Sequence, residues 1–167
     1  MMSALTEELF RYSVVWSGEP ERRKEPVDLV CVLEESVAAF YTVLQSRGIT
    51  PAITLPDAPV IRVCGRAALS RVFSNLLNNA VKYSDGDLRI VLDMAGKIVF
   101  SNTASGLHAV AVGRLFDRFY TVETAKNASG LGLAISRTLI ERMGGSISAD
   151  YENRQLSVTV CLPDLSK

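Results

Sequence analysis

The sequence has few cysteines, a single histidine and no net charge. Its three cysteines, Cys31, Cys64 and Cys161, lie far apart and form no C-x-x-C pair, so we expect reduced and mostly buried thiols. The 18 basic residues balance the 18 acidic ones. This balance gives no reason to expect a nucleic acid or a membrane surface as a partner.

Long hydrophobic runs are missing too. No apolar run approaches the ~18 residues of a membrane span, and the N-terminus lacks the apolar segment of a signal peptide. We therefore expect a cytoplasmic segment that does not itself span a membrane. The 167 residues are 48% apolar and 22% charged, which is the composition of a globular chain about one domain long.

The chain divides into three parts by composition. Residues 1–18 form an amphipathic helix, with four apolar residues at helical spacing: Leu5, Leu9, Tyr12 and Trp16. Residues 19–27 are charged and bounded by prolines, which indicates a linker. A helix this short cannot bury its own apolar stripe. We therefore interpret it as the end of a longer element. Residues 28–165 form the domain.

Periodicity predicts three helices in the domain, over residues 28–47, 67–83 and 130–143. Short or alternating apolar runs predict strands over residues 52–55, 60–64, 88–94, 97–101, 146–151 and 155–162. These elements indicate an α+β two-layer sandwich, in which three helices cover one face of a mixed, mostly antiparallel sheet. The long irregular stretch at about 103–129 is typical of a functional loop, here a mobile lid.

Three asparagines stand within five positions of the strongly apolar helix 67–83: Asn75, Asn78 and Asn79. Asparagine is a mediocre helix former, so their presence needs a reason. Asn75, Asn79 and Lys82 share one stripe because they lie four and three residues apart. One interpretation is a solvated face. The other is a nucleotide site, since an amide oxygen suits Mg²⁺, a lysine suits phosphate, and Tyr83 adds an aromatic face.

A second signal is the glycine-rich run Ser129-Gly130-Leu131-Gly132-Leu133 at the start of a helix. Glycines allow close backbone approach, and the N–H groups of a helix N-terminus bind phosphate. By itself, such a glycine-rich run is a simple turn at least as often as it is a phosphate-binding segment. It is neither a Walker A loop, because no Gly-Lys-Ser/Thr follows, nor a dinucleotide fingerprint, because no strand directly precedes it.

Taken in order, three motifs resemble those of sensor histidine kinases. Residues 75–84 (NLLNNAVKYS) resemble the N box, residues 115–120 (LFDRFY) the F box, and residues 129–135 (SGLGLAI) the second glycine box. The resemblance covers about residues 28–163 and implies the catalytic ATP-binding domain, with the ATP-binding fold shared by gyrase, Hsp90 and MutL. Residues 3–17 resemble the last turns of the dimerisation and histidine-phosphotransfer hairpin.

The resemblance implies a role for each motif residue. Asn79 would bind Mg²⁺ and Asn75 would support it, while Lys82 would meet phosphate and Tyr83 would cover the adenine. Further ATP contacts would come from Asn102, Gly106, Lys126, Ser129, Gly130, Leu131, Gly132 and Leu133. Phe116 and Phe119 would anchor the lid.

The sequence departs from the family pattern in two places. The first glycine box normally reads Asp-x-Gly-x-Gly, and here residues 102–106 read Asn-Thr-Ala-Ser-Gly. An amide thus replaces the carboxylate that reads adenine, and Ala104 replaces a glycine. In addition, no phosphoacceptor motif is present. The only histidine, His108, lies in the expected lid without an acidic neighbour, so we interpret it as an ordinary lid residue.

The resemblance therefore implies an enzyme fragment that uses ATP and Mg²⁺. It would transfer the γ-phosphoryl group to a histidine outside this chain, and from there the group would pass to a response regulator. The full-length protein would be a homodimeric, membrane-anchored bacterial sensor. Two alternatives stay open: a nucleotide-binding regulatory module without transfer activity, and an anti-sigma-factor serine kinase of the same fold.

Overall fold

The computed structural model describes residues 24–106 and 132–164. Its elements in chain order are β1 (Glu25–Asp28), α2 (Leu29–Ser46), β2 (Thr50–Thr54), β3 (Ile61–Cys64), α3 (Arg66–Tyr83), β4 (Asp87–Leu92), β5 (Lys97–Thr103), α5 (Gly132–Arg142), β6 (Ser146–Glu152) and β7 (Gln155–Cys161). The expected N-terminal helix, most of the linker, and the lid beyond Gly106 lie outside the described residues.

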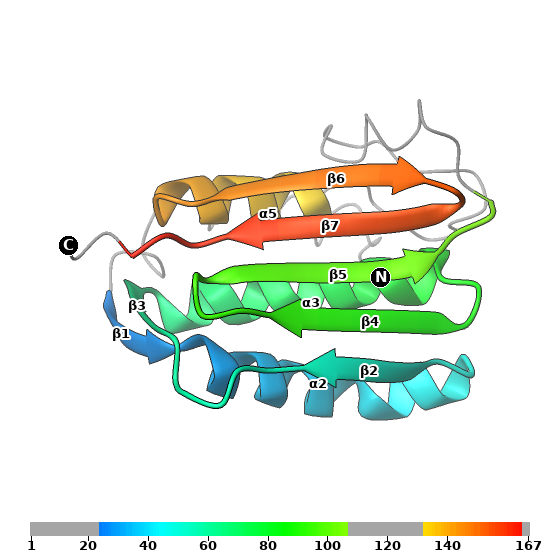
Figure 1. Ribbon diagram of the computed structural model, residues 1–167, viewed down its shortest axis with the longest axis horizontal. Coiled ribbons are helices and arrows are strands. Elements are labelled where there is room, and N and C mark those ends of the chain that lie inside the picture. Colours follow the sequence, from blue (N-terminus) through cyan, green and yellow to red (C-terminus); the bar gives the residue numbers. More distant parts are fainter. Residues whose placement is uncertain (1–23, 107–131, 165–167) are drawn as a thin grey trace, which may run out of the picture.

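Five strands form one sheet in the order β2-β4-β5-β7-β6. The β2–β4 pair is parallel, and the other three pairs are antiparallel. The helices α2, α3 and α5 all lie behind this sheet in Figure 1, so they cover one face. This arrangement confirms the α+β sandwich with a mixed, mostly antiparallel sheet.

A separate two-stranded ribbon joins β1 to β3, with Pro26 opposite Val63. Residues 25–27 were expected to belong to the linker, but they are paired strand residues. The local sequence does not reveal this pairing, because the partner strand β3 begins only at Ile61. At the end of β1, the Asp28 carboxylate caps α2 by accepting a hydrogen bond of 3.0 Å from the N–H of Val30, which is a common role of aspartate at a helix N-terminus.

The core lies between the sheet and the helices, and strand alternation decides which residues enter it. In β5 the side chains of Ile98, Phe100 and Asn102 are buried because every second residue points toward the helices. The rings of Phe100 and Phe73 of α3 lie 6.2 Å apart. Asn102 therefore lies on the apolar side of the sheet, next to α3.

The helix α2 is long and apolar enough, by length and composition, to cross a membrane, although Glu34 and Glu35 interrupt its apolar residues. Five of its apolar residues are buried against the rest of the domain: Leu29, Val32, Leu33, Val37 and Leu44. The helix also packs against α3. Its apolar character is thus accounted for by a place in the core.

Candidate functional site

The residues of the asparagine motif and of the first glycine box meet at one end of the sandwich. There α3 ends at Tyr83, β5 ends at Thr103 and α5 begins at Gly132, at the right of Figure 1. The helix α3 packs against both α5 and β5. Three segments that are distant in sequence therefore contribute to a single candidate site.

The amide of Asn79 is the most unusual group of this site. Its side chain is only 7% exposed, whereas that of Asn78 is exposed. Among the residues that the structure describes, the Asn79 amide has no hydrogen-bond partner. A buried polar group without a partner costs about 1–3 kcal/mol. The burial of Asn79 contradicts the interpretation of the asparagine stripe as a solvated face.

Asn75 lies one turn before Asn79 and makes a bond to another helix. Its Nδ2 donates a hydrogen bond of 3.0 Å to Oγ of Ser136 in α5. Ser136 is fully buried at 0% exposure. The bond thus fixes the position of α5 relative to the asparagine stripe, which is a supporting role.

Lys82 and Tyr83 occupy the last turn of α3 and are both half-buried. The Tyr83 ring packs against the hydrophobic core. The sequence places Lys82 three residues beyond Asn79, and the helix keeps the two on neighbouring turns. The structure therefore brings one cation and one amide to the same end of α3.

Asn102 is the residue at which the first glycine box departs from the family pattern. It is 3% exposed, and its Nδ2 donates only to the neighbouring carbonyl of Thr103, at 3.2 Å. Within residues 24–106 and 132–164, the Asn102 Oδ1 accepts no hydrogen bond. This buried oxygen is thus an acceptor that a ligand donor can meet.

The turn before β4 holds the chain that follows Asn102. The Asp87 carboxylate accepts hydrogen bonds from the N–H of Thr103 at 2.7 Å and from its hydroxyl at 2.9 Å. Asp85 accepts from the N–H of Ser105 at 3.0 Å. Hydrogen bonding from Ser105, the backbone N–H first, holds the pKa of the Asp85 carboxyl below its ordinary value, although desolvation opposes the shift.

The β6–β7 hairpin holds the same loop from the other side. Its turn residues Asn153 and Arg154 have φ of 52° and 65°, as in a two-residue type I′ turn. The Arg154 carbonyl accepts a hydrogen bond of 2.7 Å from the N–H of Ala104, and the Tyr151 hydroxyl donates to the Ala104 carbonyl at 2.8 Å. The loop after Asn102 is therefore braced by two separate parts of the fold.

The two small residues of this loop differ in their surroundings. Ala104 is fully buried at 0% exposure and does not have a positive φ, so alanine in place of glycine causes no backbone strain here. At Gly106, an added Cβ would have no described atom within 4 Å. The open space beside Gly106 is compatible with the close approach of a ligand.

Only part of the glycine-rich run can be placed. The helix α5 begins at Gly132, and the side chain of Leu133 is buried in the core. At this helix start the first N–H groups have no partner within the helix. Lys126, Ser129, Gly130, Leu131, Phe116 and Phe119 lie outside the described residues, as does His108.

The described residues contain no group of three or more His, Cys, Asp or Glu side chains that could hold a metal. Sequence reasoning missed the supporting residues Ser136, Asp85, Asp87 and Tyr151. The Asp85-Gly86-Asp87 run is a turn signal that marks two of them, but no local signal marks the other two.

Comparison with known proteins identifies the family of this chain. The family described as "Histidine kinase-, DNA gyrase B-, and HSP90-like ATPase" matches residues 65–166. The signal transduction histidine-protein kinase BaeS of Escherichia coli (strain K12) is 35% identical over 173 residues, covering 97% of this chain and 37% of BaeS. The sensor histidine kinase YcbM of Bacillus subtilis (strain 168) is 32% identical over 157 residues, covering 85% of this chain and 50% of YcbM.

The chain thus spans between about a third and a half of the length of these two relatives. Among solved structures, the histidine kinase AdeS of Acinetobacter baumannii matches with a TM-score of 0.75 at 24% identity, covering 95% of this chain and 76% of that one. That likeness shows the fold. Because the family match covers more than half of the 167 residues, this chain belongs to the histidine kinase-, DNA gyrase B- and HSP90-like ATPase family, which implies an ATP-binding domain, and it is homologous to sensor histidine kinases.

Proposed function

We propose that this chain is the catalytic ATP-binding part of a two-component sensor histidine kinase. It binds Mg-ATP between α3, the start of α5 and the loop after Asn102. The γ-phosphoryl group passes to a histidine outside residues 1–167 and then to a response regulator. The whole protein is a homodimer anchored in a bacterial membrane, with this part in the cytoplasm. Residues 1–18 end its dimerisation hairpin and residues 28–165 form the catalytic domain.

The observation that carries this proposal is the buried amide of Asn79, which has no hydrogen-bond partner among the residues that the structure describes. Its oxygen is the kind of neutral ligand that Mg²⁺ accepts together with water and nucleotide phosphates. Bound there, Mg²⁺ would neutralise phosphate charge.

The other residues of this chain bind and orient the nucleotide. The Lys82 ammonium offers charge-assisted hydrogen bonds to phosphate oxygens, and the Asn102 Oδ1 accepts from the adenine amino group. Tyr83 covers the adenine from its place at the end of α3. By the resemblance, Gly106, the backbone of Ser129 to Leu133, and Lys126 complete the pocket, and Phe116 and Phe119 anchor a lid. Phosphoryl transfer then depends mainly on positioning and charge neutralisation.

A two-step experiment tests the proposal. ATP is first titrated calorimetrically with and without Mg²⁺, and we expect binding that strengthens with Mg²⁺. The chain is then incubated with γ-labelled ATP, alone and with a histidine-bearing hairpin fragment of a homologous kinase. We expect acid-labile label on the hairpin only. Label on the isolated chain that disappears in His108→Ala would contradict the proposed division of labour.

A second function is favoured by one observation. Asn102 stands where the family pattern has a carboxylate, and this change favours a nucleotide-binding regulatory module without transfer activity. Such a module would bind ATP in the first step and leave every hairpin unlabelled in the second. The two functions are therefore separated by the same experiment.

A further inference from the structure

The loop after Asn102 has individual peptide planes that are fixed by hydrogen bonds. In the plane between Thr103 and Ala104, the Thr103 carbonyl accepts a bond of 2.8 Å from the N–H of Asp85. At the other end of the same plane, the N–H of Ala104 donates to the Arg154 carbonyl at 2.7 Å. This plane cannot rotate without breaking two hydrogen bonds and leaving their backbone groups without partners.

The next plane, between Ala104 and Ser105, is also held at both ends. Its carbonyl accepts a hydrogen bond of 2.8 Å from the Tyr151 hydroxyl. Its N–H donates to the Asp85 carboxylate at 3.0 Å. The two planes meet at Ala104, whose side chain is fully buried, so a rotation of the second plane disturbs the first.

The first plane sets the orientation of the Asn102 amide. Its Nδ2 donates to the Thr103 carbonyl at 3.2 Å, and within residues 24–106 and 132–164 its Oδ1 accepts no hydrogen bond. The atom left for a ligand is therefore an acceptor. An acceptor fits the amino group of a 6-aminopurine and repels the carbonyl oxygen that a 6-oxopurine carries at the same position.

Tyr151 reaches this loop from two strands away. It is paired with Leu156 of β7, and Leu156 is paired with Asn102 of β5. The three side chains thus lie in one row on the same face of the sheet. The Tyr151 ring packs against the hydrophobic core and Leu156 is fully buried, so packing holds the ring that carries the hydroxyl.

We propose that Tyr151 is a positioning residue for the nucleotide base, acting through the Ala104 carbonyl on the Asn102 amide. The role rests on the proposed function, since it requires a bound nucleotide, and Tyr151 lies outside the three motifs of the resemblance. Without the hydroxyl, the second plane is held at one end only. The nucleotide must then order the loop as it binds, which lowers its affinity.

Tyr151→Phe tests this role, because it removes only the hydroxyl. The affinities of the parent and the variant are measured calorimetrically for ATP and for inosine triphosphate, which has a carbonyl oxygen in place of the amino group. We expect the parent to prefer ATP. We expect Tyr151→Phe to weaken ATP binding about fivefold and to change inosine triphosphate binding less than about twofold.

Asn102→Leu shows whether the effect passes through Asn102. When Tyr151→Phe is added to Asn102→Leu, we expect ATP binding to weaken less than about twofold further, because the side chain that Tyr151 positions is gone. A second loss of about fivefold in the double variant would contradict the route through Asn102.

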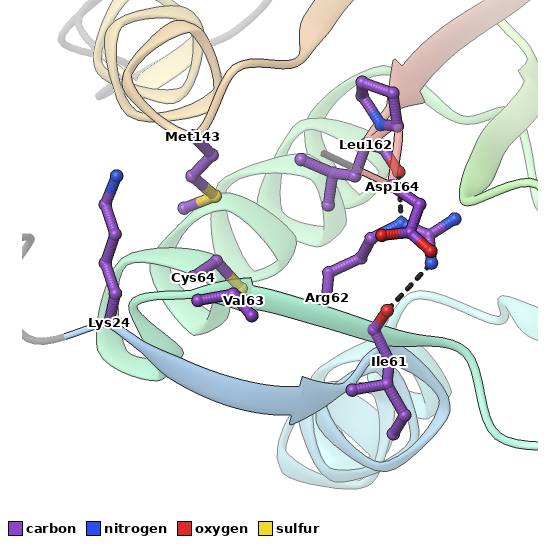
Figure 2. A pocket seen from close by; sticks show the side chains of 9 residues that line it. Lys24, Ile61, Arg62, Val63, Cys64, Met143, Leu162 and Asp164 are labelled. Carbon is purple, nitrogen blue, oxygen red and sulfur yellow. Dashed lines mark hydrogen bonds between the residues drawn. The ribbon is translucent and has the colours of Figure 1, made fainter. Parts of the chain in front are cut away.

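Arg62→Met is the matched control for a loss of stability without a loss of positioning. Arg62 lines a cavity of about 510 Å³ (Figure 2), and its Nε donates to the Leu162 carbonyl at 2.6 Å. Like Tyr151, Arg62 thus holds a main-chain carbonyl of a distant segment. Leu162, however, bonds to Gly96, just before β5 begins, whereas Asn102 lies near the end of β5. We expect Arg62→Met to lower Tm and to leave the preference for ATP unchanged.

The measured preference for ATP over inosine triphosphate decides the outcome. An unchanged preference in folded Tyr151→Phe overturns the positioning role, even where thermal unfolding shows lost stability. A parent that binds both nucleotides equally overturns it too, because Asn102 then reads no amino group. A parent that binds neither nucleotide refutes the proposed function, and the positioning role with it, so the two failures are distinguishable.

Discussion

The side-chain amide of Asn75 donates a hydrogen bond to the hydroxyl of Ser136, 61 residues away. This bond joins α3, which carries the buried Asn79, to α5, which begins at the glycine-rich run. Because Ser136 is fully buried, water cannot replace the lost partner easily. The two helices that contribute most to the candidate site are therefore held together by a specific polar contact as well as by apolar packing.

Ser136→Ala is expected to lower the free energy of unfolding by about 1–2 kcal/mol, since the Asn75 donor then loses a buried partner. Urea denaturation measures this effect. A double-mutant cycle with Asn75→Ala isolates the pair, and we expect the two changes to be less than additive. Strict additivity would show that the bond contributes nothing to stability.

Asn79→Ala is expected to weaken Mg-ATP binding at least about tenfold without destabilising the fold. The stability expectation follows from the missing hydrogen-bond partner among the described residues, and alanine is the better helix former by about 0.5 kcal/mol. Calorimetry and thermal unfolding measure the two effects. Asn78→Ala is the matched control, since Asn78 is exposed one position earlier. Parent-like Mg-ATP affinity in Asn79→Ala would refute the metal assignment.

Variants of Asn102 test whether this residue contacts the adenine and how the change from the family's carboxylate affects ATP affinity. We expect Asn102→Asp to bind ATP as well as the parent or modestly better, since a charged acceptor strengthens the bond about twofold. Asn102→Leu should weaken binding at least about tenfold, because the buried adenine amino group loses its acceptor. The affinities of all three proteins are measured at one Mg²⁺ concentration.

Ser101→Ala provides a control for Asn102, because Ser101 is the preceding strand residue and points to the opposite face of the sheet. It should bind ATP like the parent. If Asn102→Leu also binds like the parent, Asn102 does not contact adenine, and the regulatory module becomes the better interpretation.

Asp85 makes the loop after Asn102 sensitive to acid. Its folded-state pKa is depressed by the bonds from Ser105, so its contribution to stability is complete above the ordinary value of 3.8 and is lost as the pH falls through the lower folded value. The stability difference between the parent and Asp85→Asn should therefore be largest near neutral pH and shrink below about pH 4.

Denaturation curves at a series of pH values measure this difference. Asp57→Asn is a suitable control, because Asp57 is exposed and its carboxylate accepts no hydrogen bond from the described residues. A difference between the parent and Asp85→Asn that grows on acidification would contradict the assigned direction of the pKa shift.

Much of the fold follows from the sequence alone. The apolar spacing of residues 67–83 predicts α3 to within one residue of its observed start, and the strands expected over residues 146–151 and 155–162 match β6 and β7 to within one residue. These features depend on residues close in sequence, whose periodicity and turn chemistry are visible locally. The same holds for the asparagine stripe, because helical geometry brings Asn75, Asn79 and Lys82 together.

The tertiary structure alone decided which of these residues are buried and what they contact. The burial of Asn79, the bond from Asn75 to Ser136, and the bracing of Ala104 by Tyr151 and Arg154 all join segments far apart in the chain. The pairing of residues 25–27 with β3, in place of the expected linker, is of the same kind. A local pattern cannot encode such contacts, because the free energy of each depends on the complete packing of the sheet against its helices.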